Sequence, residues 1–161
     1  MVQLDSIDRA ILLELQQESR LSYAEIGSRV GLSPAAVHDR VKKLEKKGVI
    51  KAYKIQVDPE ALGLKLTAFV AIRLDNNSTG KELVPALGQF TEIEEMHSVA
   101  GETDVLLKVR VTDTKALERL IYRIKNVSGV ARITSTIVLS TALEDRPLVP
   151  VEEEETARVL R

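Results

Sequence analysis

Residues 22–48 read SYAEIGSRVGLSPAAVHDRVKKLEKKG, and this stretch carries the start and stop signals of two consecutive helices. Ser22 and Glu25 have the S-x-x-E spacing of a capping box, in which each side chain accepts a hydrogen bond from the other residue's backbone N–H. Gly31 follows, and glycine adopts the left-handed conformation that closes many helices. The spacing therefore predicts a helix that opens at Ser22 and runs through Val30, followed by a tight turn.

The second helix of this stretch opens with Ser33-Pro34, a capping serine followed by a proline at the first helical position, where the missing N–H is tolerated. We expect this helix to run to Lys47 and to stop at Gly48. Three of its apolar side chains recur on one face, at about 100° per residue. These side chains are expected to point into a core: Val37, Val41 and Leu44.

The flanking residues extend the pattern in both directions. Residues 5–18, DSIDRAILLELQQE, predict an earlier helix with Asp5 as its cap, so that three short helices surround the turn as in a helix-turn-helix. Residues 49–57, VIKAYKIQV, alternate in the manner of a strand. We expect this strand to form the wing of the motif and to present Lys51 and Lys54.

The 161-residue chain has a net charge of −1, but its cations are unevenly spread. Between His38 and Lys54 there are seven Lys or Arg residues against two Asp or Glu, whereas residues 61–150 carry eleven of each sign. For a charge run alone, the solvated face of a small helical bundle is the commoner explanation. The combination with a capped helix, a glycine turn and a basic strand favours DNA binding instead.

Candidate DNA-contacting residues follow from this interpretation. Small residues at the start of the second helix allow its backbone to approach a major groove closely, and lysines further along neutralise phosphates without selecting a sequence. For His38, solvation without a DNA contact is an equal alternative. The full set comprises Ser22, Ser33, Ala35, Ala36, His38, Asp39, Arg40, Lys42, Lys43, Lys46 and Lys51.

After Gly63 the sequence is rich in β-branched and aliphatic residues, which favours strands. Thr114 is expected to cap the later of two helices, and Pro85 indicates that the earlier one starts late or is kinked. The expected order is strand 64–74, helix 80–90, strands 92–100 and 104–111, helix 114–126 and strand 130–141. This β-α-β-β-α-β order is the split βαβ, ferredoxin-like arrangement, so the fold class is α+β.

Residues 4–150 resemble the Lrp/AsnC, or feast/famine, family of bacterial and archaeal transcription regulators. The residues that carry the resemblance are LDSIDRAILLELQQESRLSYAEIGSRVGLSPAAVHDRVKKLEKKGVIKAY, SVAGETDVLLKV and ARITSTIVL. The resemblance implies an N-terminal winged helix-turn-helix joined to a C-terminal ferredoxin-like βαββαβ domain that binds a small effector. It also implies homodimers through that second domain, often assembled into octamers.

This organisation predicts four regions. They are a helix-turn-helix domain over 1–48, a wing or linker strand over 49–63, an effector-binding and oligomerisation domain over 64–145, and a tail over 146–161. The tail is rich in proline and glutamate and lies partly outside the family pattern. A frayed tail or a short docking helix is expected there.

Two segments of the second domain are candidates for an effector site. The turn Gly101-Glu102-Thr103-Asp104 lies between expected strands, where exposed backbone N–H groups can hold a carboxylate and Asp104 can pair with an α-ammonium, as an amino acid requires. A hairpin in which glycine and aspartate only shape the loop, and threonines that are ordinary strand residues, are the alternatives. In the family, effectors bind near the matching G-x-x-D turn. The predicted effector-binding residues are Ser98, Gly101, Thr103, Asp104, Thr134 and Thr136.

Several other function classes are not supported by the sequence. Cysteine is absent and only two histidines exist, so metal and thiol chemistry have no carrier, and neither a metal nor another cofactor is expected. No apolar run approaches the roughly 20 residues that span a bilayer, and the N-terminus lacks a signal-peptide layout. The expected protein is a cytoplasmic, non-enzymatic regulator that binds double-stranded DNA and a small effector of the amino-acid class. The rivals are a metabolite sensor or assembly protein that does not bind DNA, and a small enzyme.

Overall fold

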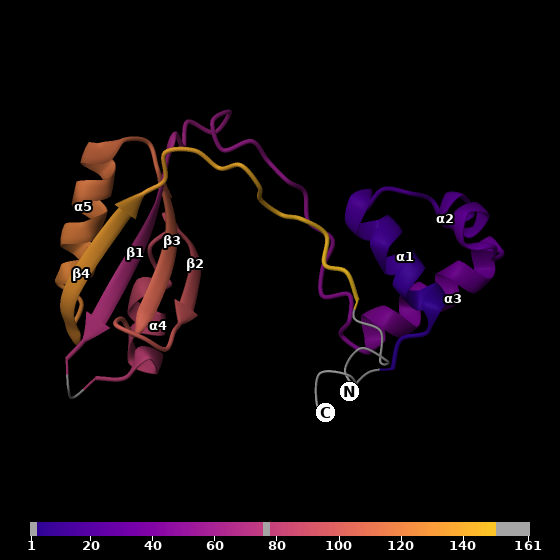
Figure 1. Cartoon of the computed structure of the whole chain (residues 1–161), viewed down its shortest axis with the longest axis horizontal. Helices are drawn as coiled ribbons and strands as arrows, with labels where there is room; N and C mark the ends of the chain where they lie inside the picture. Colours follow the sequence, from indigo (N-terminus) through magenta and orange to yellow (C-terminus); the bar gives the residue numbers. More distant parts are fainter. Residues whose placement is uncertain (1–2, 76–77, 151–161) are drawn as a thin grey trace, which may run out of the picture. The chain divides into compact units, whose positions relative to one another are not determined.

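The computed structural model describes residues 3–75 and 78–150, except for the side chains of residues 80 and 82. The chain divides into two compact units (Figure 1). One comprises Met1–Ile55 with Leu143–Arg161, and the other comprises Gln56–Ala142.

The described part of the first unit contains α1 (Ser6–Gln17), α2 (Tyr23–Val30) and α3 (Pro34–Lys46). The predicted caps are confirmed: the side chains of Asp5, Ser22 and Ser33 each accept a hydrogen bond from a backbone N–H in the first turn of their helix. The helices pack around side chains that are wholly shielded from solvent. These are Ile11, Ile26, Val37 and Val41.

The turn between α2 and α3 depends on two glycines. Gly31 closes α2 with a φ of 73°, in the left-handed region that the sequence predicted. Gly27, within α2, accepts a hydrogen bond from Leu32 N–H at 2.9 Å. A Cβ at Gly27 would lie 2.4 Å from the Leu32 carbonyl oxygen, so only glycine lets the turn fold back this closely.

The strand predicted over 49–57 is not formed in this chain. Val49 and Ile50 instead close α3, where both backbone N–H groups donate to the Leu44 carbonyl at 2.9 and 3.3 Å. Residues 51–58 have no strand pairing. Alternating side chains favour a strand only where a second strand satisfies the backbone groups, and the described part of this unit has none.

The described residues of the second unit form six elements in the predicted βαββαβ order, which confirms the ferredoxin-like fold. In chain order they are β1 (Leu66–Leu74), α4 (Gly80–Leu87), β2 (Ile93–Ser98), β3 (Val105–Val111), α5 (Thr114–Lys125) and β4 (Val130–Ile137). All neighbouring strands are antiparallel, in the order β2-β3-β1-β4. Pro85 lies inside α4, and β4 ends four residues earlier than the strand predicted to residue 141.

The cap predicted for α5 was placed one residue too late. Thr114 is the first helical residue, and Asp113 is the cap, with its carboxylate accepting a hydrogen bond from Ala116 N–H at 2.8 Å. This hydrogen bond is the main reason that the pKa of Asp113 lies below its usual value. Asp and Thr are both good caps, and the backbone conformation at the end of β3 decides between them.

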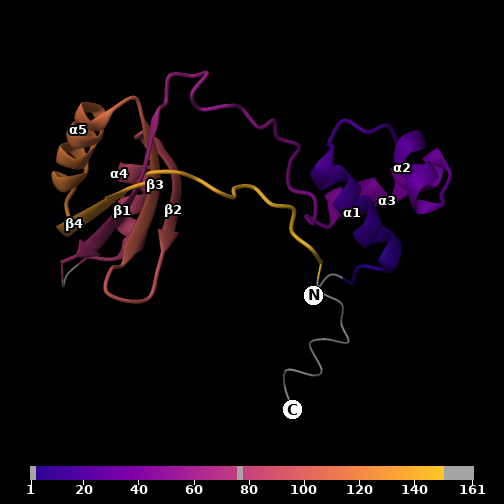
Figure 2. The ribbon, with the colours of Figure 1, turned by 45° about the horizontal axis from the view of Figure 1, so that its top comes forward.

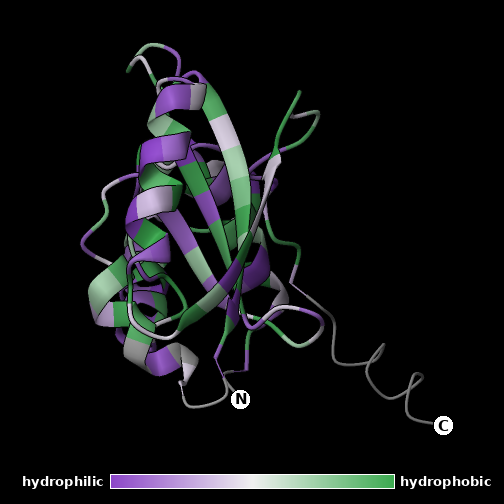
Figure 3. Ribbon diagram, turned by 90° about the vertical axis from the view of Figure 1, so that its left-hand side faces the viewer, coloured by the Kyte–Doolittle hydropathy of each residue, from purple (hydrophilic) through white to green (hydrophobic). Residues whose placement is uncertain are grey.

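One face of the sheet is covered by α4 and α5, and the other face is open. Side chains of β3 alternate strictly between buried and half-buried positions. In Figure 3 the strands and helices of this unit carry both hydrophobic (green) and hydrophilic (purple) bands. The covered side forms the core, with Val70, Leu107, Leu87 and Leu120 fully buried. The open face is centred on Phe69, which remains 40% exposed. No helix in the described residues is long and apolar enough to cross a membrane.

Candidate functional site

The outward face of α3 is the candidate nucleic-acid interface. Ala35, His38, Asp39, Lys42, Lys43 and Lys46 are all exposed there, as predicted for the DNA-facing side. Lys43, Lys46 and the nearby exposed Lys51 form no ion pair with a described residue. Their positive charges are therefore available for phosphates. Ala36 is half-buried, because its neighbour Val37 points into the core.

Arg40 turns away from this face and joins α3 to the start of α1. Its Nη1 lies 2.6 Å from Asp5 Oδ2 and 2.7 Å from Asp8 Oδ1. These carboxylates raise the pKa of Arg40, while the Asp8 N–H and then the Arg40 guanidinium lower the pKa of Asp5. These ion pairs connect α3 to the start of α1, and the predicted DNA contact of Arg40 stays a prediction.

A second connection joins α3 to the segment that follows it. One oxygen of Glu45 accepts from Lys42 Nζ at 2.9 Å, and the other accepts from Tyr53 Oη at 3.1 Å. The hydrogen bond from Lys42 lowers the pKa of Glu45, and burial raises the pKa of Tyr53 to about 12. Sequence reasoning missed both Glu45 and Tyr53. The spacing of Lys42 and Glu45, three residues apart on a helix, was a usable signal for the first contact.

The two serines predicted to contact DNA both cap helices. Ser22 Oγ donates to Glu25 Oε2 at 2.6 Å, and this bond is the largest cause of the lowered pKa of Glu25. Ser33 Oγ accepts from Ala36 N–H at 3.2 Å and orients the first turn of α3. His38 packs edge-to-face on Tyr23, with ring centroids 5.4 Å apart, so α2 helps to orient it.

The turn before β3 is a shaped loop tied to the neighbouring strand. Gly101 has a φ of 149°, which strains any other residue. Asp104 Oδ2 accepts from Leu74 N–H at 2.8 Å, and Asp104 N–H donates to Ile72 O at 2.9 Å. Asp104 therefore joins β3 to β1 beside the irregularity between Arg73 and Leu74.

Strand register decides which predicted effector residues share a face. Thr134 lies opposite Ala71 and Thr136 lies opposite Phe69, so both threonines stand on the open face. Ser98 lies opposite Val105, whose side chain enters the core, so Ser98 belongs to the covered side. Thr103 is half-buried within the turn.

The same register places two arginines opposite one another. Arg73 and Arg132 are cross-strand partners, both are exposed, and neither pairs with a described acidic residue. Like charges directly opposite on a sheet are unfavourable unless an anion lies between them. Sequence reasoning did not assign a role to either arginine, since the pairing follows only from the register. Arg73 precedes Leu74 in β1, and the Leu74 N–H donates to Asp104. The arginine pair therefore lies next to Asp104.

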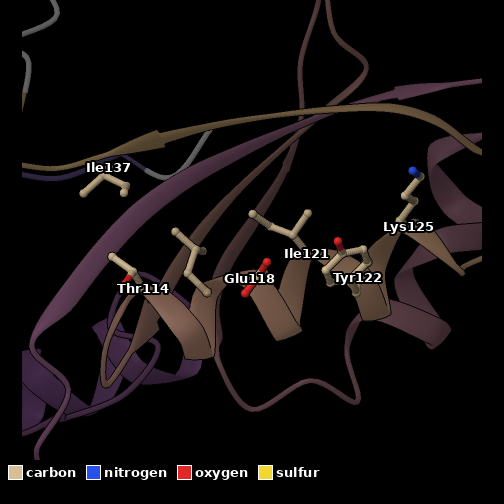
Figure 4. A pocket seen from close by; sticks show the side chains of 7 residues that line it. Thr114, Glu118, Ile121, Tyr122, Lys125 and Ile137 are labelled. Carbon is tan, nitrogen blue, oxygen red and sulfur yellow. The ribbon is translucent and has the colours of Figure 1, made fainter.

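A separate groove lies between α5 and the end of β4. Figure 4 shows Thr114, Glu118, Ile121, Tyr122 and Lys125 along the helix, with Ile137 across from them. The groove measures about 330 Å³ and contains none of the predicted effector-binding residues. Among the described residues, no group of three or more His, Asp or Glu side chains is arranged to hold a metal ion.

Comparison with protein families gives two matches, one in each half of the chain. Residues 4–51 match a family described as winged helix-turn-helix DNA-binding, and residues 67–148 match the Lrp/AsnC ligand binding domain.

Individual proteins are similar over nearly the whole chain. The HTH-type transcriptional regulator LrpA of Mycobacterium tuberculosis is 42% identical over 147 residues, which cover 91% of this chain and 97% of that protein. The leucine-responsive regulatory protein of Escherichia coli is 36% identical over 149 residues, which cover 91% of each protein.

Solved structures show the same fold. A feast or famine regulatory protein from M. tuberculosis complexed with L-methionine has a TM-score of 0.86 and 41% identity, covering 92% of this chain and 100% of the other. A transcriptional regulator from Neisseria meningitidis in complex with L-Met has a TM-score of 0.86 and 30% identity, covering 91% and 96%.

Proposed function

Because the chain belongs to the Lrp/AsnC family of DNA-binding transcriptional regulators, we propose that α3 docks in the major groove and that an effector bound to the second unit controls this contact. The observation that carries the proposal is the lysine-rich, exposed face of α3. Such a protein acts in the cytoplasm, where its DNA is. Its relatives are regulators, and we propose no catalytic step.

Within this interface the residues divide by role. Ala35 and Ala36 let the backbone of α3 approach base edges, and Ser33, His38, Asp39 and Lys42 lie beside them. Lys43, Lys46 and Lys51 neutralise phosphates. Arg40 and Ser22 act indirectly, since their polar groups are engaged in orienting the helices.

Replacing Lys43 and Lys46 together by alanine is expected to weaken binding to every DNA sequence alike. The slope of log affinity against log salt falls by about 0.9 for each phosphate that a lysine no longer neutralises, hence by about 2. Fluorescence anisotropy with two unrelated duplexes over a salt series measures the slope. Lys65→Ala with Lys115→Ala, two exposed lysines of the other unit, is the control. Weakening confined to one duplex would refute the phosphate role.

The effector is proposed to be an amino acid held at the end of the open face. Two related structures contain L-methionine, and the E. coli relative is named leucine-responsive. Here the Gly101–Asp104 turn offers N–H groups and a carboxylate, while Arg73 and Arg132 offer cations and Thr134 and Thr136 offer hydroxyls nearby. Thr103 completes the turn. Opposite charges in this arrangement match an α-ammonium and an α-carboxylate.

Asp104→Asn tests the ammonium partner while keeping an acceptor for Leu74 N–H. After a thermal-shift screen of twenty amino acids identifies one that binds, calorimetry is expected to show its affinity lowered about 10- to 100-fold, as for the removal of a charge-assisted hydrogen bond. DNA binding without effector stays unchanged. Asp104→Ala, which also removes the bond to Leu74, serves as the comparison. Unchanged affinity in Asp104→Asn would exclude this role.

Two copies are proposed to pair through the open sheet face, and such dimers to assemble into octamers. No helix of the described residues covers the open face, and Phe69 with its neighbours Ala71 and Leu106 forms an apolar centre there. Ion pairs of Lys108 with Glu94 and Glu95 border it. An apolar centre with a charged rim is typical of protein interfaces. A dimer presents two α3 helices to two half-sites.

A further inference from the structure

The C-terminal segment belongs to the same compact unit as the three helices, and one side chain of α1 holds it there. Gln16 Oε1 accepts a hydrogen bond from Leu148 N–H at 2.8 Å, and Gln16 Nε2 donates to Leu148 O at 3.1 Å. Gln16 Nε2 also donates to Leu12 O at 3.2 Å, which restrains the amide on its own helix. Figure 2 shows the described part of this segment, up to residue 150, in yellow.

This contact involves the backbone of the segment and not its side chains. The side chains of Leu148 and Val149 are 79% and 75% exposed, so apolar burial contributes little to the docking. A two-point amide pairing fixes both the position and the direction of the chain at Leu148. Gln16 therefore acts as an anchor that determines where the residues after 148 begin.

The sequence beyond the anchor is acidic and lies outside the family match. The match to the Lrp/AsnC ligand binding domain ends at residue 148, and residues 152–155 are four consecutive glutamates, followed by Arg158 and Arg161. By contrast, residues 38–54 carry seven cations against two anions. The two stretches are complementary in charge.

Residues next to the anchor on α1 and residues at the end of α3 line one cavity. Leu15, next to Gln16, lines the same cavity of about 450 Å³ as Glu45, which is next to Lys46. A chain extends by at most about 3.5 Å per residue, so residues 152–155 can lie up to about 14–25 Å from Leu148. That distance exceeds the width of a cavity of this size.

We infer that α1 carries a docking site for the chain's own C-terminal segment, and that the segment delivers an acidic run which competes with DNA for the lysines of α3. The inference rests on the proposed DNA-binding function. Tethering raises the effective concentration of the glutamates to the millimolar range. Apparent DNA affinity then falls in proportion to the fraction of molecules whose lysines are uncovered.

The test compares the full chain with a variant in which all four glutamates of 152–155 are replaced by glutamine, at unchanged length. Fluorescence anisotropy uses a random-sequence duplex of about 30 base pairs, which is long enough for two α3 helices spaced about one helical turn apart. If the lysines are covered about 80% of the time, the variant binds about fivefold more tightly at low salt. The difference shrinks as salt rises, because salt screens the competing charges as well.

The anchor is tested separately with Gln16→Ala and its matched control Gln17→Ala, which changes the neighbouring exposed glutamine of α1. Gln16→Ala is expected to tighten DNA binding about two- to fivefold by releasing the tether, and Gln17→Ala to leave it unchanged. Equal affinities of the four-glutamine variant and the unaltered chain would overturn the inference. So would a tightening in that variant without any in Gln16→Ala. A failure of every variant to bind DNA would refute the proposed function instead.

Discussion

Phe69→Glu is expected to convert the proposed dimer into a folded monomer and to lower its affinity for a two-site DNA about 100-fold or more. Phe69 stands at the centre of the open face, between Thr136 on β4 and Lys108 on β3. In a monomer the new carboxylate is solvated and lies beside Lys108, so the fold is retained. In a face-to-face dimer the carboxylate loses its water, and Lys108 beside it is already paired with Glu94 and Glu95, so burial costs several kcal/mol.

Sedimentation velocity measures the disappearance of the dimer, and anisotropy with one-site and two-site duplexes measures the consequence. Binding to a single site changes little, because each monomer keeps its own α3. Val84→Glu is the matched control, since Val84 is 52% exposed on α4, away from the open face. A Phe69→Glu protein that sediments as the unaltered protein does would show that this face is not the interface.

Gly27→Ala is expected to destabilise the first unit by about 1–3 kcal/mol, the usual range for overpacking a close contact. The added Cβ would lie 2.4 Å from the Leu32 carbonyl oxygen, which is backbone and cannot turn aside. Either α2 or the turn has to move, and α3 moves with it. DNA affinity is therefore expected to fall about tenfold or more, since misplacing a recognition helix breaks several interactions together.

Hydrogen exchange of the α2 and α3 amides measures the local destabilisation, while exchange in β1 and β3 reports on the second unit, which stays unaffected. Gly31→Asn is the control. No atom lies within 4 Å of a Cβ at Gly31, and asparagine tolerates the left-handed φ of 73° at modest cost. Protection in Gly27→Ala equal to that of the unaltered protein would contradict the steric argument.

Local features of this chain were predictable because their causes lie a few residues apart. Ser22 bonds to Glu25 N–H, and Ser33 bonds to Ala36 N–H, each three residues along the chain. The ends of α2 and α3 at Gly31 and Gly48 each depend on one backbone φ angle, of 73° and 70°. The strand over 49–57 failed for the opposite reason, since a strand requires a partner that its own alternation does not specify.

The candidate site was predictable only in part. The exposed lysines of α3 follow from helical periodicity, because the side opposite Val37 and Val41 faces solvent. The roles of Arg40 and Asp104 did not follow, since each depends on a residue at least 30 positions away. The hydrogen bond between Glu45 and Tyr53 was not predictable either, although the two residues are only eight positions apart. It forms only because the segment after α3 turns back toward the helix.

By itself, therefore, the sequence determined the helices of the first unit, the strand and helix order of the second and the basic face of α3. Capping, alternation and periodicity act within one element. Only the tertiary structure decided that Arg73 faces Arg132, that Gly27 contacts Leu32, and that Gln16 holds Leu148 at a separation of 132 residues. Register and packing bring distant residues together, and a local pattern does not specify which residues those are.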